Sequence, residues 1–103
     1  MIPIRHFFKP IRTFPDFSIR GIGILEQRLP GITDRPSGTG DYLFMYLYEA
    51  ASFATKDGIG KHKPGTVVIW RPTDRQYYGS TEHPWKHSWI HCDGNWVRRC
   101  LKN

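Results

Sequence analysis

The stretch PWKHSWIHCDG, from Pro84 to Gly94, decides how the rest of this chain is interpreted. Read as a β-strand, it places alternate side chains on opposite faces. One face then carries two indoles, two imidazoles and a carboxylate, from Trp85, His87, Trp89, His91 and Asp93. Indole and imidazole groups need hydrogen-bond partners when they are buried. This face therefore predicts a wall for a small polar ligand, and the opposite face, with Ile90 and Cys92, predicts packing.

Around this strand, short apolar runs alternate with turns. The 103 residues include ten glycines and eight prolines, and 15% are aromatic, which favours a single all-β domain with its own core. The sequence predicts a β-sandwich or barrel with strands at Phe17–Gln27, Asp41–Glu49, Ser52–Thr55, Ile59–Lys63, Val67–Trp70, Arg75–Tyr78 and Pro84–Gly94. Pro30-Gly31 predicts a turn, and residues 35–40 predict a loop.

Some predicted strands carry further information. Glycines at positions 21 and 23 predict a bend, a bulge or the close approach of another group. Residues 41–49 are apolar on both faces, so they predict either a strand covered on both sides or a tyrosine-lined cavity. The run Val67–Trp70 predicts a buried strand, and Gly79 is expected to end the strand before it.

The two ends differ from the middle of the chain. Residues 1–16 predict an irregular arm, because prolines interrupt regular structure, and its aromatic residues Phe7 and Phe8 predict that it lies across the body. Residues 17–94 form the predicted barrel. Residues 95–103 predict the start of a helical linker, with Asn95 as its cap.

Charge and cysteine content narrow the class of protein. The net charge is +6, yet the chain has no block of five or six like charges, so solvated loops are favoured over a nucleic-acid footprint. Two cysteines make neither a disulfide framework nor a paired metal motif, which predicts a reduced, cytoplasmic protein. We expect no signal peptide and no membrane span.

The histidines do not predict a metal site. His87 and His91 would lie about 13 Å apart along a strand, too far to share one ion. No HxH motif or helical HxxxH motif occurs among His6, His62, His83, His87 and His91. Cys92 shares a face with Ile90 and is expected to be a small buried hydrophobe. We therefore predict no metal, no cofactor and no catalytic residue.

The residue types do suit recognition of a sugar, which presents hydroxyl groups and an apolar face. Trp89 would supply an aromatic plane, and hydrogen bonds would come from Arg35, Tyr78 and His87. Simpler roles stay open at this point. The indoles of Trp85 and Trp89 could be core, His87 could be a satisfied core histidine, and Arg35 could pair with Asp34 or Asp41.

The order of motifs resembles the N-terminal cupin domain of AraC-type bacterial transcription regulators. The resemblance runs from about Asp34 to the C-terminus and is weaker before it. Its motifs are Asp34-Arg35-Pro36-x-Gly38, Tyr42, Lys63-Pro64-Gly65-Thr66-Val67-Val68-Ile69, Pro72, Tyr78-Gly79 and Trp85-x-His87-x-Trp89-Ile90. It implies an all-β cupin domain, a double-stranded β-helix or jelly roll, that binds a small effector, often a sugar, inside the barrel.

The resemblance also implies roles for particular residues. The ligand-binding residues would be Arg35, Tyr78, His87 and Trp89, and the N-terminal arm would fold over the bound effector. DNA would be bound by a separate helix-turn-helix domain that these 103 residues do not contain, and a homodimer is one state that the resemblance allows. Gln76 stands near the position where a metal-binding cupin would carry a histidine, so metal-dependent chemistry is not implied.

The sequence thus predicts an effector-sensing domain and not an enzyme. One alternative is a small stand-alone cupin enzyme, a sugar isomerase or epimerase, with His87 or His91 as general base and a tyrosine as acid. Another is an arginine-rich fragment that binds DNA in a salt-sensitive way.

Overall fold

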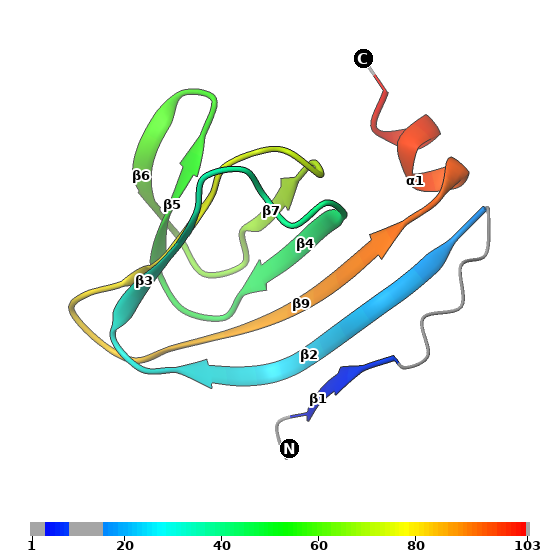
Figure 1. Cartoon of the computed structure of the whole chain (residues 1–103). Helices are drawn as coiled ribbons and strands as arrows, with labels where there is room; N and C mark the ends of the chain where they lie inside the picture. Colours follow the sequence, from blue (N-terminus) through cyan, green and yellow to red (C-terminus); the bar gives the residue numbers. More distant parts are fainter. Residues whose placement is uncertain (1–3, 9–15, 103) are drawn as a thin grey trace.

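The computed structural model describes residues 4–8 and 16–102, which form two antiparallel sheets and one short helix. The five-stranded sheet has the order β1 (Ile4–Phe7), β2 (Ser18–Arg28), β9 (Trp85–Asp93), β4 (Tyr42–Leu47) and β7 (Val67–Trp70). The four-stranded sheet has the order β3 (Gly31–Arg35), β8 (Gln76–Ser80), β5 (Ala51–Thr55) and β6 (Gly58–His62). Helix α1 (Asn95–Cys100) follows β9 (Figure 1).

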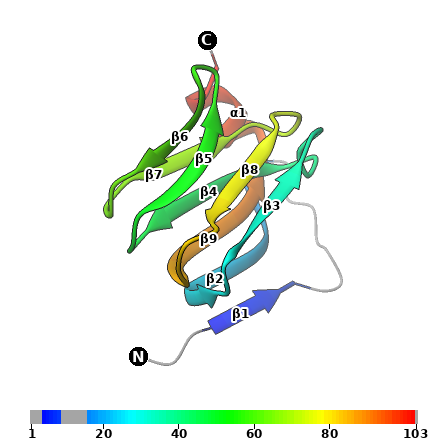
Figure 2. The ribbon, with the colours of Figure 1, turned by 90° about the vertical axis from the view of Figure 1, so that its left-hand side faces the viewer.

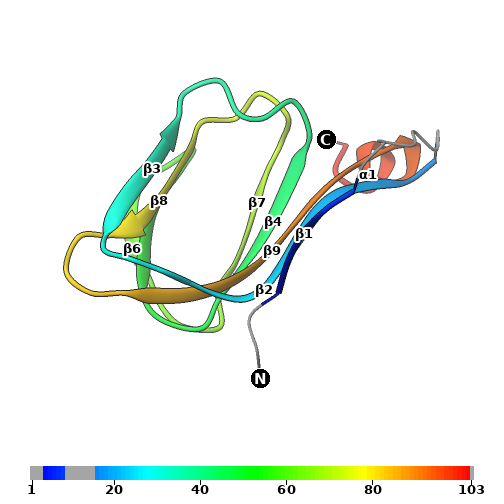
Figure 3. The same ribbon diagram turned by 60° about the horizontal axis from the view of Figure 1, so that its bottom comes forward.

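The two sheets face each other and enclose a common interior (Figures 2 and 3). The longest strands, β2 and β9, pair from Ser18↔Asp93 to Arg28↔Trp85 and run along the five-stranded sheet to the edge where the sheets meet. Gly31, just after β2, and Ser80, just before β9, pair with each other in the other sheet. The result is the all-β jelly roll that the sequence predicts, with a short helix at its C-terminal end.

Strand β4 shows how the inside and outside of the barrel differ. Its inward side chains, Leu43, Met45 and Leu47, are at most 1% exposed. On the outer face, Tyr42 packs in a second cluster with Cys92 and Val97 of α1, whereas Tyr46 is 41% exposed. The strand is therefore covered on both sides only near its start, and its tyrosines do not line a cavity inside the barrel.

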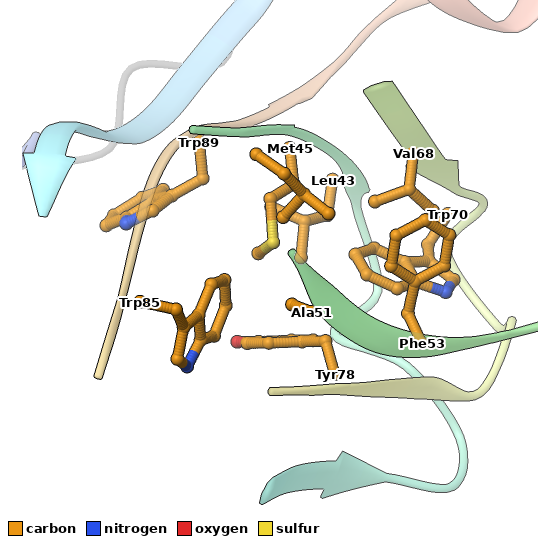
Figure 4. Packing of buried hydrophobic residues seen from close by; sticks show 10 residues of the cluster. Leu43, Met45, Ala51, Phe53, Val68, Trp70, Tyr78, Trp85 and Trp89 are labelled. Atoms are coloured by element: carbon orange, nitrogen blue, oxygen red, sulfur yellow. The ribbon is translucent and has the colours of Figure 1, made fainter. Parts of the chain in front are cut away.

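The core occupies one end of the barrel more fully than the other. Figure 4 shows Phe53, Val68 and Trp70 together at one end of the cluster, and Trp85 and Trp89 at the other. Trp70 donates its indole N–H to the carbonyl of Ala54 at 3.4 Å. Burial of these aromatic and aliphatic side chains supplies the main stabilising free energy of a domain this size.

Two segments expected to be irregular are strands. Residues Gly31–Arg35 lie between two prolines and predict a turn and a loop, but they pair in full with β8. Residues Ile4–Phe7, which contain no proline, pair with Gly21–Ile24 as an edge strand. Residues 1–3 and 9–15 of the predicted arm lie outside the described residues.

Three further predictions are wrong in detail. Strand β7 is only half buried, because it pairs with β4 and turns Val67 and Ile69 outward. Gly79 lies inside β8 and not at its end: a Cβ there would stand 2.1 Å from the Gly31 carbonyl oxygen, so only glycine lets β3 approach. Gly94, and not Asn95, occupies the helix N-cap position.

Strand β2 contains a bulge that matters for the site. Its register with β9 shifts between Gly23, opposite Trp89, and Glu26, opposite His87. Leu25 lies in this irregularity with a φ of 52°, and its N–H donates to Ser88 Oγ at 3.0 Å. The extra residue reverses the alternation of faces, so that Glu26 joins the inward-facing residues.

Candidate ligand-binding cavity

A cavity of about 600 Å³ lies in the half of the barrel that the core leaves open. Its size is in the range of small-molecule sites in proteins. All four residues predicted from the sequence line it: Arg35 from β3, Tyr78 from β8, and His87 and Trp89 from β9. Leu43 and Met45 of β4 form the apolar boundary with the core.

Trp89 lies against the backbone of β2. A Cβ placed on Gly23 would stand 2.2 Å from the indole Nε1, so the ring needs the space that this glycine leaves. The sequence prediction that a strand glycine marks a close approach is confirmed here. Trp89 is both 9% exposed in the core cluster and part of the cavity wall, so the core interpretation and the cavity interpretation both apply to it.

His87 is the most unusual polar group of the cavity. It is 1% exposed, and neither ring nitrogen has a hydrogen-bond partner among the described residues. Glu26 Oε1 lies 3.5 Å from His87 Nε2. Burial lowers the pKa of His87 to about 4, more strongly than the charge of Glu26 raises it, so the imidazole is neutral at pH 7. It is not a satisfied core histidine.

Glu26 is a cavity residue that sequence reasoning missed. Arg5 of β1 donates to both of its carboxylate oxygens, at 2.6 and 2.7 Å. Burial alone would raise the pKa of Glu26, but the hydrogen bonds and charge of Arg5, together with His87, hold it below its ordinary value. Strict alternation places Glu26 on the outer face, and only the bulge at Leu25 turns it inward.

Arg35 opens a chain of hydrogen bonds along one wall. Its Nη1 donates to the Tyr78 hydroxyl at 2.9 Å and to Gln76 Oε1 at 3.0 Å. Gln76, which is 0% exposed, donates from Nε2 to Thr39 Oγ1 at 2.9 Å. Gln76 therefore holds Arg35 in place.

The chain continues to Asp41 and His91. Thr39 Oγ1 donates to Asp41 Oδ1 at 2.6 Å. Asp41 Oδ1 also lies 2.9 Å from His91 Nδ1, and a hydrogen bond between them requires the proton to be on Nδ1, because a carboxylate only accepts. Burial alone would raise the pKa of Asp41, but these hydrogen bonds, together with the charges of His91 and Arg20, hold it below its ordinary value. His91 lines the cavity and binds this carboxylate, a role that the sequence leaves open.

The loop before β4 sets the position of Thr39 and Asp41. Gly38 has a φ of 73°, and a Cβ there would stand 2.3 Å from the Pro72 carbonyl oxygen. Gly40 donates its N–H to that same oxygen at 3.0 Å. A residue with a side chain at position 38 would push the loop away, so Gly38 fixes the end of the hydrogen-bonded wall.

The simpler role suggested for Arg35 does not hold. Asp34 pairs instead with Arg75, at 2.9 Å, and Asp41 pairs with His91 and lies 3.9 Å from Arg20. Trp85 is 1% exposed and packs in the core, which is the simpler of the two roles left open for it. Cys92 is buried on the opposite face, where burial raises the pKa of its thiol to about 11.

The N-terminal strand contributes to the mouth of the cavity. Arg5, Phe7 and Phe8 line it, and the Phe7 ring lies 5.6 Å from the Trp89 indole, centroid to centroid. Phe7 is 53% exposed and Phe8 is 39% exposed. The described part of the arm thus lies across the body beside the cavity, as its aromatic residues predict.

The described residues contain no group of three or more histidine, cysteine or acidic side chains placed to hold a metal ion. Within the same residues, no helix is both long enough and apolar enough to cross a membrane.

The groups that the cavity offers to a ligand are a neutral imidazole, an indole plane, a tyrosine hydroxyl and several guanidinium groups.

No protein-family model and no curated protein matches this sequence. Solved structures do match. The plu4264 protein from Photorhabdus luminescens has a TM-score of 0.59 at 16% identity, over 97% of this chain and 84% of that one. The Cupin_2 domain of an XRE family transcriptional regulator from Enterobacter cloacae has a TM-score of 0.55 at 14% identity, over 86% and 95%.

A cupin domain from Bordetella pertussis is similar to the same extent, with a TM-score of 0.54 at 9% identity over 90% of this chain and 93% of that one. At such identities the likeness establishes the fold alone. The chain has the cupin jelly-roll fold, as the resemblance seen in its sequence implies.

Proposed function

We propose that this cupin domain senses a small polar effector, a sugar, in the barrel cavity of a cytoplasmic AraC-type transcription regulator. The observation that carries the proposal is His87, whose two buried ring nitrogens have no hydrogen-bond partner among residues 4–8 and 16–102, in a cavity that has room for a ligand. A buried polar group without a partner costs free energy, and a ligand hydroxyl that bonds to it would recover that cost.

The other three predicted residues would complete recognition. The indole of Trp89 offers a plane for the apolar face of a sugar, and Tyr78 and Arg35 offer hydrogen bonds from the facing sheet. Because β3 and β8 belong to one sheet and β9 to the other, a bound effector would join both sheets and favour one arrangement of them. DNA binding belongs to the separate domain that the resemblance implies. The XRE-family neighbour supports a regulatory role, since it is itself the cupin domain of a regulator.

The proposal is tested by thermal unfolding with a panel of neutral monosaccharides, disaccharides and sugar acids. A ligand at a hundredfold excess over Kd adds about 2.7 kcal/mol of stability, which raises Tm by about 10–20 °C in a domain this size. Tyr78→Phe, which removes only a hydroxyl, and Trp89→Ala are expected to weaken the shift. Trp96→Ala is the matched control, because Trp96 is 56% exposed on α1.

A panel in which no compound raises the Tm of the natural chain would overturn the proposal. The same samples distinguish sensing from catalysis. We expect each bound sugar to be recovered unchanged after incubation, whereas conversion to an isomer or epimer would support the enzyme alternative.

A further inference from the structure

The cavity carries more positive than negative groups. Its lining includes four arginines, Arg5, Arg20, Arg28 and Arg35, and two carboxylates, Glu26 and Asp41. His87 adds no charge at pH 7, because burial holds its imidazole neutral. A ligand that enters this cavity therefore meets an excess of guanidinium groups, which favours an anion over a neutral molecule.

Both carboxylates are already engaged by the protein. Glu26 receives two hydrogen bonds from Arg5, and Arg28 Nη1 lies 3.7 Å from its Oε1. Asp41 accepts from Thr39, pairs with His91 and lies 3.9 Å from Arg20. Three of the arginines are thus near a carboxylate.

Arg35 is the exception. Among the described residues, it pairs with no carboxylate, and both of its hydrogen bonds leave from Nη1 to uncharged oxygens. Its Nε and Nη2 have no hydrogen-bond partner in the described part of the chain. The Tyr78 hydroxyl accepts from Arg35, so its own proton stays available for an acceptor in the cavity.

Together, Arg35 and Tyr78 offer hydrogen-bond donors placed to bind a carboxylate. The Nε–H and one Nη2–H of a guanidinium are parallel donors that match the two oxygens of a planar carboxylate. Arg35 is held for this role by Gln76, which is fully buried and is itself anchored through Thr39. The neutral His87 and the Trp89 plane remain for the uncharged part of the ligand.

We propose, on the basis of the proposed sensing function, that the effector is a sugar acid whose carboxylate binds to the free edge of Arg35 beside the Tyr78 hydroxyl. Its hydroxyl groups bond to His87, and its ring lies on Trp89. A neutral sugar of the same shape leaves Arg35 without a counter-charge in a half-buried site and binds more weakly.

The test is calorimetric titration of the whole chain with matched pairs: galactose with galacturonate, and glucose with glucuronate. We expect at least one acid to bind tenfold or more tightly than its neutral partner, with an affinity that falls as salt concentration rises. Arg35→Gln should cost that acid a factor of ten to a hundred and the neutral sugar much less. Arg99→Gln, which removes the same charge from the exposed face of α1, should change neither.

Two further samples separate geometry from charge. Arg35→Lys keeps the charge but loses the parallel donors, so it should bind the acid clearly more weakly than the natural chain does. Galactose phosphate carries more charge but no planar carboxylate. The inference is overturned if a neutral sugar binds as tightly as its acid, if Arg35→Lys binds the acid as tightly as arginine does, or if the phosphate binds best. If no sugar of either kind binds, the sensing function itself fails.

Discussion

At the scale of single residues, His87 links the cavity to the stability of the domain. A histidine has an ordinary pKa of 6.5, and burial lowers the value for His87 to about 4 in the folded state. Between these values the unfolded chain binds the proton more readily than the folded one. The stabilising contribution of the neutral imidazole is therefore complete above pH 6.5 and is lost as the pH falls towards 4.

We predict that unfolding by urea at pH 5 shows a free energy of unfolding about 1–2 kcal/mol lower than at pH 7. His87→Gln should lose most of this difference, because it has no proton to take up. His6→Gln, at an exposed position of β1, should keep it. The account of His87 is contradicted if the natural chain is equally stable at pH 5 and pH 7. It is also contradicted if His87→Gln shows the same difference in unfolding free energy as the natural chain.

The residues of the site show where sequence reasoning works. Alternation along residues 85–93 correctly places His87 and Trp89 inside and Cys92 outside, since a regular strand has a period of two. Glu26 could not be found in this way, because its orientation depends on the bulge in β2. The glycines at positions 21 and 23 indicate that an irregularity is possible, but they do not give its position. The partners of Arg35 could not be predicted from local sequence either, because Gln76 and Tyr78 lie 41 and 43 positions further along the chain.

At the scale of elements, the bulge in β2 strains the backbone at Leu25 and in return turns Glu26 into the cavity. Leu25 has a φ of 52°, where a side chain on Cβ is disfavoured by about 1 kcal/mol or more. The strand keeps this conformation because Ser88 accepts the Leu25 N–H and because Glu26 gains Arg5 on the inner face. A strained residue beside a candidate site is a common arrangement.

We predict that Leu25→Gly is about 1 kcal/mol more stable than Leu25→Ala, because both lose the same packing but only glycine tolerates the positive φ. The matched pair at Ile22, in the regular part of β2, should show the opposite order, with glycine less stable than alanine. Chemical unfolding of the four variants measures both differences. An alanine variant at position 25 as stable as the glycine variant would show that the bulge carries no strain.

Element boundaries also show what tertiary pairing adds to local sequence. The strands predicted on either side of Asp57-Gly58 and the strand Val67–Trp70 follow from turn residues and apolar runs, and the structure has all three within one residue of the predicted bounds. Strand β3 was not predictable, because Gly31–Arg35 is short and lies between prolines. It exists because β8 offers a complete set of partners, with Gly79 leaving space for its backbone.

At the scale of the whole molecule, the barrel divides into a filled end and a hollow end. Large aromatic residues such as Phe53 and Trp70 fill the first (Figure 4). Charged and polar groups from β1, β2, β3, β8 and β9 line the second. The alternating pattern and the turns predict the all-β class, and the order of motifs predicts the jelly roll. The distribution of space inside it depends on side-chain packing between two sheets, which a linear pattern does not specify.

The central claim, that the hollow end binds a small polar ligand, is tested most directly by the indole N–H signals of the four tryptophans in a ¹H–¹⁵N spectrum. We predict that titration with the sugar or sugar acid that raises Tm most moves the Trp89 signal, in proportion to the bound fraction. The exposed Trp96 on α1 and the core residue Trp70 should move little. A titration in which Trp89 stays in place, or in which Trp96 moves instead, would contradict the account.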